Sequence, residues 1–436
     1  MKVSANVKRD LQGHSRHILA FLYWILLAAL VGLVAGLVST AFYYTFHWAV
    51  TTRTAHPWLI WLLPAAGLVI TALYRSCRVK KDRGTNFVLS AVRDNTSLSI
   101  LTAPLVFLST IITHLFGGSS GREGAILQIG GSISFSLGKL LRLDEKDSRI
   151  ITMCGMAAAF SALFGTPLCA AVFAMEVVSV GVMYYAAIVP CITSSLVGLS
   201  IAKYLGVPAT SFLLHGIPRI APLSLLKVLG MGVLVALLAI IFCRVMQNTH
   251  RLYERFFPNP FLRAAVGGVL VIALTYLVWI WAPGTYDYNN AGEEIIHAAI
   301  AGQSRPEAFL WKIIFTAVTL GAGYKGGEIV PVFFTGATFG CTVAPFLGFS
   351  PSFGAGLAMV SLFCGVTNCP LSSLLLAYEL FSASEGFSME TLALFALCIA
   401  VSYMLSGYSG LYGEQKIMYS KHRLEYINRK ANQNEP

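Results

Sequence analysis

The sequence predicts an all-α integral membrane protein. Hydrophobic residues make up 56% of the 436-residue chain, charged residues make up 12%, and the mean hydropathy is +0.69. This composition leaves too little polar surface for a soluble globular protein. Two windows, 18–51 and 330–377, contain no Asp, Glu, Lys or Arg. Each window exceeds the ~20 residues that a bilayer-spanning helix needs, so each holds one long tilted helix or several shorter ones.

Basic residues stand in short segments between the apolar runs and predict the orientation of the chain. By the positive-inside rule these segments are cytoplasmic, and the acidic segment 287–307 is then external. We therefore expect a multi-pass plasma-membrane protein with a cytoplasmic N-terminal segment, 1–17, and a cytoplasmic basic tail, 413–436. Because the basic residues do not gather on one folded face, the net charge of +11 does not indicate a nucleic-acid partner. The basic segments contain Lys2, Lys8, Arg9 and Arg16; Arg75, Arg78, Lys80, Lys81 and Arg83; Lys139, Arg142, Lys146 and Arg149; Arg244, Arg251 and Arg255; and the stretch from Lys416 to Lys430.

The cysteines predict no special chemistry. Nine cysteines are scattered through apolar stretches without C-x-x-C or Cys/His ligand spacing. Such residues are usually small buried side chains. We expect no structural metal, no cofactor and no disulfide framework.

One motif occurs twice, in corresponding apolar segments. FGTPLCAAVFAMEVV at 164–178 and TNCPLSSLLLAYELF at 367–381 both place Pro-Leu nine residues before a glutamate, Glu176 in the first and Glu379 in the second. The two copies are 203 residues apart. Each glutamate ends an apolar helix, and we interpret both as caps or partners at a helix interface.

A second motif repeats in the same order and at nearly the same offset. GREGA at 121–125 and GGEIVP at 326–331 each place a glutamate beside glycine. The sequence therefore predicts two related transmembrane halves, 18–215 and 216–412. Repeats with Gly- or Pro-interrupted apolar segments are typical of transporters whose broken helices meet near the bilayer midplane. The pattern leaves open whether the repeat is inverted or parallel.

The glycine-rich segments predict helix starts inside the membrane. Arg122 and Glu123 are the only charged residues between Asn95 and Gly138, and glycines flank the pair. Glycine lets the backbone leave helical geometry, and a helix that begins there points unpaired N–H groups and a positive dipole end into a cavity. Such an end attracts an anion.

A carboxylate at an anion site can couple the anion to a proton. When charged, the side chain of Glu123 or Glu328 can occupy the place of an anion, and when protonated it can step aside. The alternative is a permanent structural ion pair of Glu123 with Arg122 or another base. Adjacent residues on a helix do not face each other, so Arg122 is a poor partner unless the backbone is irregular there.

These residues resemble motifs of the CLC family of anion channels and proton-coupled anion antiporters. GGSSGREGAILQIGG resembles its G-[RK]-E-G-P motif with Ala125 in place of proline, GGEIVP corresponds to G-x-F-x-P, and YSGLYGEQ resembles the segment that carries an anion-coordinating tyrosine. The resemblance covers residues 20 to 418. It implies a CLC-like inverted repeat of many tilted and half-spanning helices, assembled as a homodimer with one anion path in each subunit.

The resemblance also implies the residues of the site. Glu123 becomes the gating glutamate, and Glu328 is the second candidate for gating or proton transfer. RGTNF at 83–87 is the weakened counterpart of the G-S-G-I-P loop, and Tyr408 is the alternative to Tyr412 as the anion-coordinating phenol. The implied anion contacts are Thr85, Asn86, Gly121, Arg122, Gly124, Ile329, Val330 and Tyr412.

Two departures from the family pattern bear on the substrate. Chloride/proton exchangers of the family carry a second proton glutamate directly after the position of Glu176, where this chain has Val177. Conversely, Glu328 stands where those exchangers have no glutamate, and this combination resembles the fluoride/proton antiporter branch. Thr85, in place of the central serine, does not decide between the branches.

The sequence therefore predicts a proton-coupled antiporter that exports fluoride across the plasma membrane in exchange for protons. A chloride channel or chloride/proton exchanger on the same fold is the alternative. The expected partners are fluoride or chloride, protons and the lipid bilayer. We expect no enzyme, because no H-E-x-x-H motif and no paired-carboxylate arrangement competes with the repeat. A receptor or scaffold without transport would show no anion flux.

Overall fold

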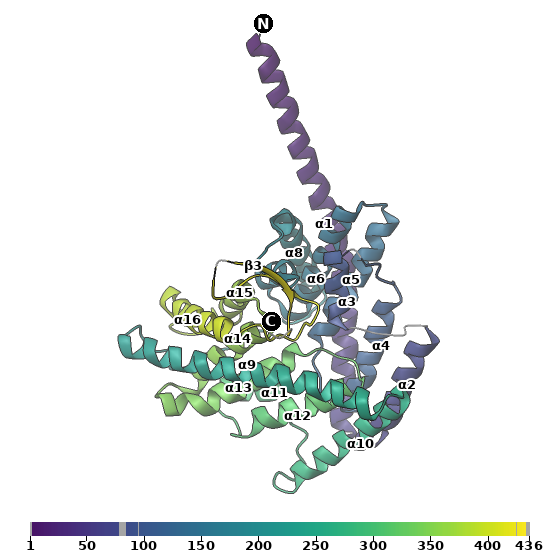
Figure 1. Ribbon diagram of the computed structural model, residues 1–436, viewed down its shortest axis with the longest axis vertical. Coiled ribbons are helices and arrows are strands. Elements are labelled where there is room, and N and C mark those ends of the chain that lie inside the picture. Colours follow the sequence, from purple (N-terminus) through teal and green to yellow (C-terminus); the bar gives the residue numbers. More distant parts are fainter. Residues whose placement is uncertain (1, 78–83, 95, 424, 433–436) are drawn as a thin grey trace.

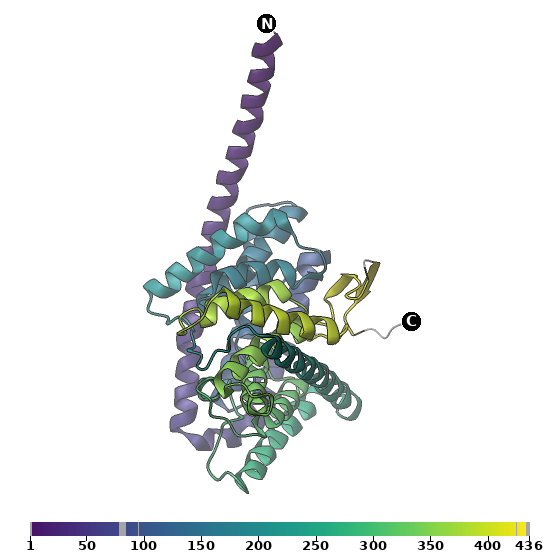
Figure 2. The same cartoon turned by 90° about the vertical axis from the view of Figure 1, so that its left-hand side faces the viewer.

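The computed structural model describes residues 2–77, 84–94, 96–423 and 425–432. It is a bundle of helices from which the N-terminal part of the first helix projects (Figure 1, Figure 2). The helices of the first half are α1 (Lys2–Ala55), α2 (Leu63–Ser76), α3 (Thr85–Asp94), α4 (Thr102–Leu115), α5 (Glu123–Leu140), α6 (Glu145–Phe164), α7 (Pro167–Glu176) and α8 (Ile188–Tyr204).

The second half also contains eight α-helices in the described residues. In the whole bundle, short 3₁₀ helices extend three of the α-helices: η1 (Pro57–Leu62) precedes α2, η2 (Tyr185–Ala187) precedes α8, and η3 (Ala344–Leu347) follows α13. The helices of the second half are α9 (Pro222–Phe256), α10 (Pro260–Trp279), α11 (Glu293–Ile300), α12 (Ala308–Gly321), α13 (Ile329–Val343), α14 (Pro351–Thr367), α15 (Pro370–Phe381) and α16 (Met389–Leu405).

Corresponding helices also make corresponding contacts. In the first half α5 packs on α6, and α1 packs on α6 and α8; in the second half α13 packs on α14, and α9 packs on α14 and α16. The helix ends correspond as well. Gly165 ends α6 with φ 79° and Asn368 ends α14 with φ 60°, which is the left-handed conformation that glycine and asparagine tolerate best. The proline that starts the next helix follows two residues later in both halves.

The helices differ greatly in length, as the predicted tilted and half-spanning arrangement requires. In the described part of the chain, 6 helical segments are long and apolar enough to cross a membrane, and other apolar helices have only 10–17 residues. At 1.5 Å per residue the shorter ones cover roughly 15–26 Å, less than the ~30 Å hydrocarbon core. The prediction of an all-α membrane protein with partly spanning helices is therefore confirmed.

The two repeated glutamates cap helices in the opposite half. Glu176, at the end of α7, accepts hydrogen bonds from the backbone N–H groups of Leu371 (3.1 Å) and Ser372 (2.9 Å) at the start of α15. Glu379, in α15, accepts from the equivalent groups of α7, Leu168 at 2.8 Å and Cys169 at 2.9 Å. This exchange of equivalent contacts relates the halves by a local twofold axis. It also confirms that both glutamates cap helices at the interface.

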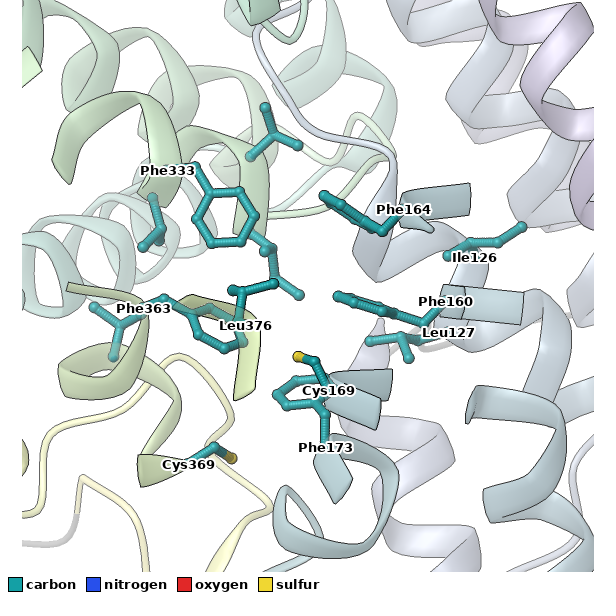
Figure 3. Packing of buried hydrophobic residues seen from close by; sticks show 14 of the residues in the cluster. Ile126, Leu127, Phe160, Phe164, Cys169, Phe173, Phe333, Phe363, Cys369 and Leu376 are labelled. Carbon is teal, nitrogen blue, oxygen red and sulfur yellow. The ribbon is translucent and has the colours of Figure 1, made fainter. Parts of the chain in front are cut away.

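Aromatic side chains from both halves form the core beside this interface. Figure 3 shows Phe160, Phe164 and Phe173 from α6 and α7 facing Phe333 and Phe363 from α13 and α14. The Phe164 and Phe333 rings meet edge to face with centroids 6.0 Å apart, and the Phe173 and Phe363 centroids are 5.5 Å apart. The halves are therefore joined by close aromatic packing.

A small sheet ties the C-terminal tail to the first half. Strand β1 (Ser179–Val180) pairs in parallel with β2 (Lys416–Tyr419), and β2 pairs antiparallel with β3 (Tyr426–Lys430). This sheet was not predicted from the sequence, because strands of two to five residues show too little apolar alternation to be recognised. Of the predicted cytoplasmic basic residues, Arg78, Lys80, Lys81 and Arg83 lie outside the described residues.

Candidate functional site

Two broken segments meet where the two halves face each other. Gly121 and Gly327, which precede α5 and α13, form an isolated antiparallel pair. Each donates its backbone N–H to the carbonyl of the other, and both hydrogen bonds are 2.7 Å long. The starts of α5 and α13 are therefore fixed side by side, as the sequence predicts for two helices that begin inside the membrane.

The carboxylate of Glu123 lies at the start of the opposite helix. Its side chain is fully buried. Oε2 accepts hydrogen bonds from the backbone N–H of Arg122 at 3.0 Å and from that of Val330, in the first turn of α13, at 3.3 Å. A helix N-terminus favours negative charge, so this carboxylate occupies a place suited to an anion. Oε1 has no hydrogen-bond partner within the described residues.

Glycines make the close approach possible. A Cβ atom at Gly121 would lie 2.6 Å from Oε2 of Glu123. A Cβ at Gly124 would lie 2.9 Å from Cα of Gly327 and 3.1 Å from Oγ1 of Thr85. Because the N–H of Gly121 is bonded to Gly327, Gly121 supplies space in this structure rather than a donor for an anion.

Glu328 lies across the same meeting point. It is the residue directly before α13, and its Oε2 lies 3.6 Å from the position that a Cβ at Gly124 would take. The residue is half-buried. Within the described part of the chain, no Lys, Arg or His forms an ion pair with it, so its carboxylate faces the site without a neutralising partner.

The start of α3 forms another wall of the site. Thr85 is buried, and its hydroxyl donates to the carbonyl of Gly124 at 3.4 Å. The side-chain oxygen of Asn86 accepts a hydrogen bond from the backbone N–H of Glu414 at 3.0 Å. Thr85 therefore lies beside the meeting point, whereas Asn86 ties α3 to the segment that follows Tyr412.

Tyr412 and its alternative, Tyr408, have different surroundings. Tyr412 is 1% exposed, its hydroxyl has no hydrogen-bond partner among the described residues, and it lies within electrostatic reach of Glu328 and Glu123. The hydroxyl of Tyr408 is instead 3.0 Å from Oγ of Ser420 in the C-terminal hairpin. The structure therefore brings Tyr412, and not Tyr408, to the site.

Arg122 contacts its neighbour despite being adjacent in sequence. Its Nε lies 3.5 Å from Oε1 of Glu123 because Arg122 is the N-cap of α5, where the backbone is not yet regular helix. Its Nη2 also lies 3.0 Å from Oε1 of Glu293. Glu293 is not among the site residues that the sequence predicts. The acidic segment around it was assigned only a side of the membrane, and no local pattern links it to Arg122.

The last of the predicted anion contacts, Ile329, is fully buried at the start of α13.

One sequence pattern near the site resembles an enzyme motif. Gly-Gly-Ser-Ser-Gly at 117–121 matches the G-x-S-x-G pattern of hydrolase nucleophile elbows. Such a serine is exposed on a turn, whereas Ser119 is fully buried and its hydroxyl lies 3.2 Å from that of Thr316. No group of three or more His, Cys, Asp or Glu in the described chain could hold a metal ion.

Comparisons with known proteins agree with this geometry. Residues 66–407 match the family model described as voltage gated chloride channel. A chloride/fluoride channel protein of Pseudomonas syringae pv. tomato is 35% identical over 406 residues, which cover 92% of this chain and 87% of that protein. An H(+)/Cl(-) exchange transporter, ClcA of Vibrio vulnificus, is 22% identical over 391 residues, 82% of this chain and 81% of that protein.

Solved structures show the same fold. The crystal structure of a CLC-type fluoride/proton antiporter superimposes with a TM-score of 0.85 at 29% identity and covers 90% of this chain and 98% of its own. A slow cyanobacterial Cl⁻/H⁺ antiporter gives a TM-score of 0.72 at 18% identity, with 88% and 94% covered. With a family model that spans most of its length, the chain belongs to the voltage gated chloride channel, or CLC, family.

Proposed function

We propose that this chain is an antiporter that exports fluoride across the plasma membrane in exchange for protons. The observation that supports the proposal most directly is the hydrogen bond from the backbone N–H of Val330 to Oε2 of Glu123, 3.3 Å long. The carboxylate of one half thereby occupies the anion-attracting helix start of the other half. Protonation removes its charge, so an incoming anion can take its place.

The surrounding donors suit a small, strongly hydrated anion. Fluoride loses its water only where other donors replace it. The backbone N–H of Val330 and the hydroxyls of Thr85 and Tyr412 surround the meeting point, and the Tyr412 hydroxyl lacks a protein partner among the described residues. We assign these groups to the anion path, with Gly124 and Ile329 shaping its walls.

Glu328 and Val177 favour fluoride over chloride as the substrate. Glu328 places a second carboxylate beside the path, and Val177 leaves the position of an inner proton glutamate apolar and fully buried. The named relatives include a chloride/fluoride channel protein and a fluoride/proton antiporter, which agrees with this assignment. In this proposal Glu328 serves proton transfer or steadies the fluoride path.

The two halves are proposed to form one path within a subunit of a homodimer. Leu168 and Leu371 occupy equivalent positions on the outer face of α7 and α15 and are 40% and 53% exposed. The half-buried carboxylate of Glu379 lies beside Leu168 and accepts a hydrogen bond from its backbone N–H. A carboxylate at this depth is costly against lipid, so a second copy of the chain is the better cover for this face. From the positive-inside rule, segments 1–17 and 413–436 are proposed to lie in the cytoplasm.

Reconstitution into liposomes tests the function. Purified protein in vesicles loaded with fluoride should release fluoride and take up protons together, and Glu123→Gln should lose the proton uptake because an amide does not titrate. Replacement of fluoride by chloride separates the substrates. Equal transport of chloride would assign the chain to chloride exchange, and fluoride release without proton uptake would make it a channel.

A further inference from the structure

The guanidinium of Arg122 lies between two carboxylates. Its Nε is 3.5 Å from Oε1 of Glu123, and its Nη2 is 3.0 Å from Oε1 of Glu293. The Arg122 side chain is 8% exposed, and that of Glu293 is 43% exposed. One cation therefore connects the fully buried carboxylate at the helix start with a carboxylate that meets solvent.

Packing holds Arg122 in this bridging position. Its guanidinium carbon lies 5.4 Å from the centroid of the Phe46 ring and 5.7 Å from that of the Tyr43 ring, both in α1. Cation–π contacts of this kind attract the guanidinium to the ring faces. The guanidinium thus keeps its place between the carboxylates.

Glu293 is also fixed in place by the segment that precedes it. Glu293 is the first residue of α11, and Gly292 before it has φ 76°, with a Cβ position only 2.7 Å from the ring of Phe334 in α13. The backbone N–H of Asn290 donates to the carbonyl of Gly118 at 3.1 Å. The ammonium of the buried Lys312 donates to the carbonyl of Asn290 at 2.7 Å. These contacts hold the start of α11 against the broken segment that leads to Glu123.

We propose that Glu293 is a positioning residue that shares Arg122 with Glu123 and so sets the pH at which Glu123 leaves the anion site. The proposal rests on the proposed function. The negative charge of Glu293 offsets part of the positive field of Arg122 at Glu123, since charges at 3–4 Å interact strongly away from bulk water. Without Glu293, Arg122 stabilises the charged carboxylate of Glu123 more fully, and a higher proton concentration is needed to release it.

Other polar groups near this bridge do not replace Glu293. On the site side, Tyr412 lies within electrostatic reach of both Glu123 and Glu328, and neither Tyr412 nor Glu328 forms an ion pair with Arg122. On the other side, His114 in α4 lies near Arg122 with both ring nitrogens directed at backbone carbonyls, those of Thr110 and Ser120. Glu293 is therefore the carboxylate placed to compete with Glu123 for Arg122.

The test compares Glu293→Gln with Glu294→Gln in proteoliposomes. Both variants remove one negative charge from the first turn of α11, but Glu294 is exposed and does not form an ion pair with Arg122. Fluoride release is measured against external pH. We expect the midpoint of the pH profile to move to lower pH in Glu293→Gln by about 0.5 unit or more, and to stay at the wild-type value in Glu294→Gln.

A double-variant cycle shows whether the effect passes through Arg122. In an Arg122→Gln background the shift caused by Glu293→Gln should become smaller, because only the direct repulsion between the two carboxylates remains. An undiminished shift would mean that Arg122 plays no part and would overturn the proposal. Equal midpoints for Glu293→Gln and wild type, or an equal shift in Glu294→Gln, would overturn the proposal. If Glu293→Gln does not assemble, Glu293→Asp replaces it, because aspartate keeps the charge on a shorter side chain. Glu293→Asp should shift the midpoint to lower pH by a smaller amount, and no shift would overturn the proposal. Wild-type vesicles without proton-linked fluoride release would instead refute the proposed function.

Discussion

Gly121 and Gly327 exchange two backbone hydrogen bonds of equal length, 2.7 Å each. Each glycine stands two residues before the first residue of its helix, which is Glu123 in α5 and Ile329 in α13, so the two positions are equivalent. The two glycines pair antiparallel. Residues opposite each other in an antiparallel pair are related by a twofold axis that reverses the chain direction. A local twofold axis therefore relates the two halves at this pair, in agreement with the reciprocal caps of Glu176 and Glu379.

This pairing predicts different outcomes for alanine at the two glycines. A Cβ at Gly327 would lie 2.4 Å from the backbone nitrogen of Gly124, whereas a Cβ at Gly121 would meet Oε2 of Glu123, the end of a flexible side chain, at 2.6 Å. Gly327→Ala should therefore lower the stability by about 1–3 kcal/mol, and Gly121→Ala should mainly displace the carboxylate and weaken proton coupling. Thermal unfolding in detergent and vesicle flux measure the two effects.

Gly230→Ala provides the matched control for these variants. Gly230 lies within α9, and a Cβ there would meet only Leu347, at 4.0 Å. Alanine is about 1 kcal/mol better than glycine inside a helix, so this variant should keep or raise the unfolding temperature. Equal losses in Gly230→Ala and Gly327→Ala would contradict the close approach of the two halves.

Tyr412→Phe should separate transport from stability. The Tyr412 hydroxyl is buried without a protein partner in the described part of the chain, and an unpaired buried hydroxyl does not stabilise the fold. Its removal should leave the unfolding free energy within about 0.5 kcal/mol of wild type or raise it. Loss of one hydrogen bond to the anion should lower fluoride transport about tenfold. A stability loss with normal flux would assign Tyr412 to packing alone.

The reciprocal caps should contribute stability without proton coupling. Glu379→Ala leaves the N–H groups of Leu168 and Cys169 without their acceptor, at a cost of about 1–3 kcal/mol. Glu176→Ala should cost at least as much, because Glu176 also accepts from the hydroxyl of Ser372 at 2.5 Å. Thermal unfolding measures the losses, and the exposed Glu385→Ala is the control. A changed proton-to-fluoride ratio in the two cap variants would place these glutamates on the proton path.

The parts of the fold that the sequence predicted are those with repeated local signals. Pro-Leu before a glutamate, and glycine beside a glutamate, each occur twice; the structure places the Pro-Leu copies in α7 and α15 and the glycine–glutamate copies at the starts of α5 and α13. The C-terminal sheet was missed because β1 has two residues and its partner β2 lies more than 200 residues away in sequence. Short strands that depend on a distant partner leave no periodic pattern.

The same distinction holds for the site. Glu123 stands out because one carboxylate in a long uncharged stretch is costly unless it has a function, and the structure places it at a helix start of the other half. Glu293 does not stand out, because it belongs to an acidic segment of ordinary composition, 287–307. Its contact with Arg122 depends on the way Gly292 and Lys312 hold the start of α11. Such a tertiary contact is not encoded in any local pattern.

The C-terminal hairpin should loosen at acidic pH. Oε2 of Glu414 accepts a hydrogen bond from Nζ of Lys430 at 2.6 Å, and this bond lowers the pKa of the Glu414 carboxyl, assisted by Arg93. A carboxyl whose pKa is lower in the folded state than in the unfolded state stabilises the folded state at pH values above the unfolded pKa, near 4.5. The contribution is lost as the pH falls through the folded value. Because the pair is near the surface, the effect is at most about 1 kcal/mol.

Hydrogen–deuterium exchange of β2 and β3 measures this loosening. After correction for the intrinsic pH dependence of exchange, protection in the wild-type hairpin should fall several-fold between pH 6 and pH 3, as a change of up to about 1 kcal/mol implies. Glu414→Gln should show the low-pH protection at every pH, because the amide carries no charge for Lys430 to stabilise. Glu425→Gln, at an exposed position in the same hairpin, should behave like wild type. Since the backbone N–H of Glu414 also bonds Asn86 beside Thr85, a hairpin that loosens with acid would carry the same pH dependence to the α3 wall of the anion site.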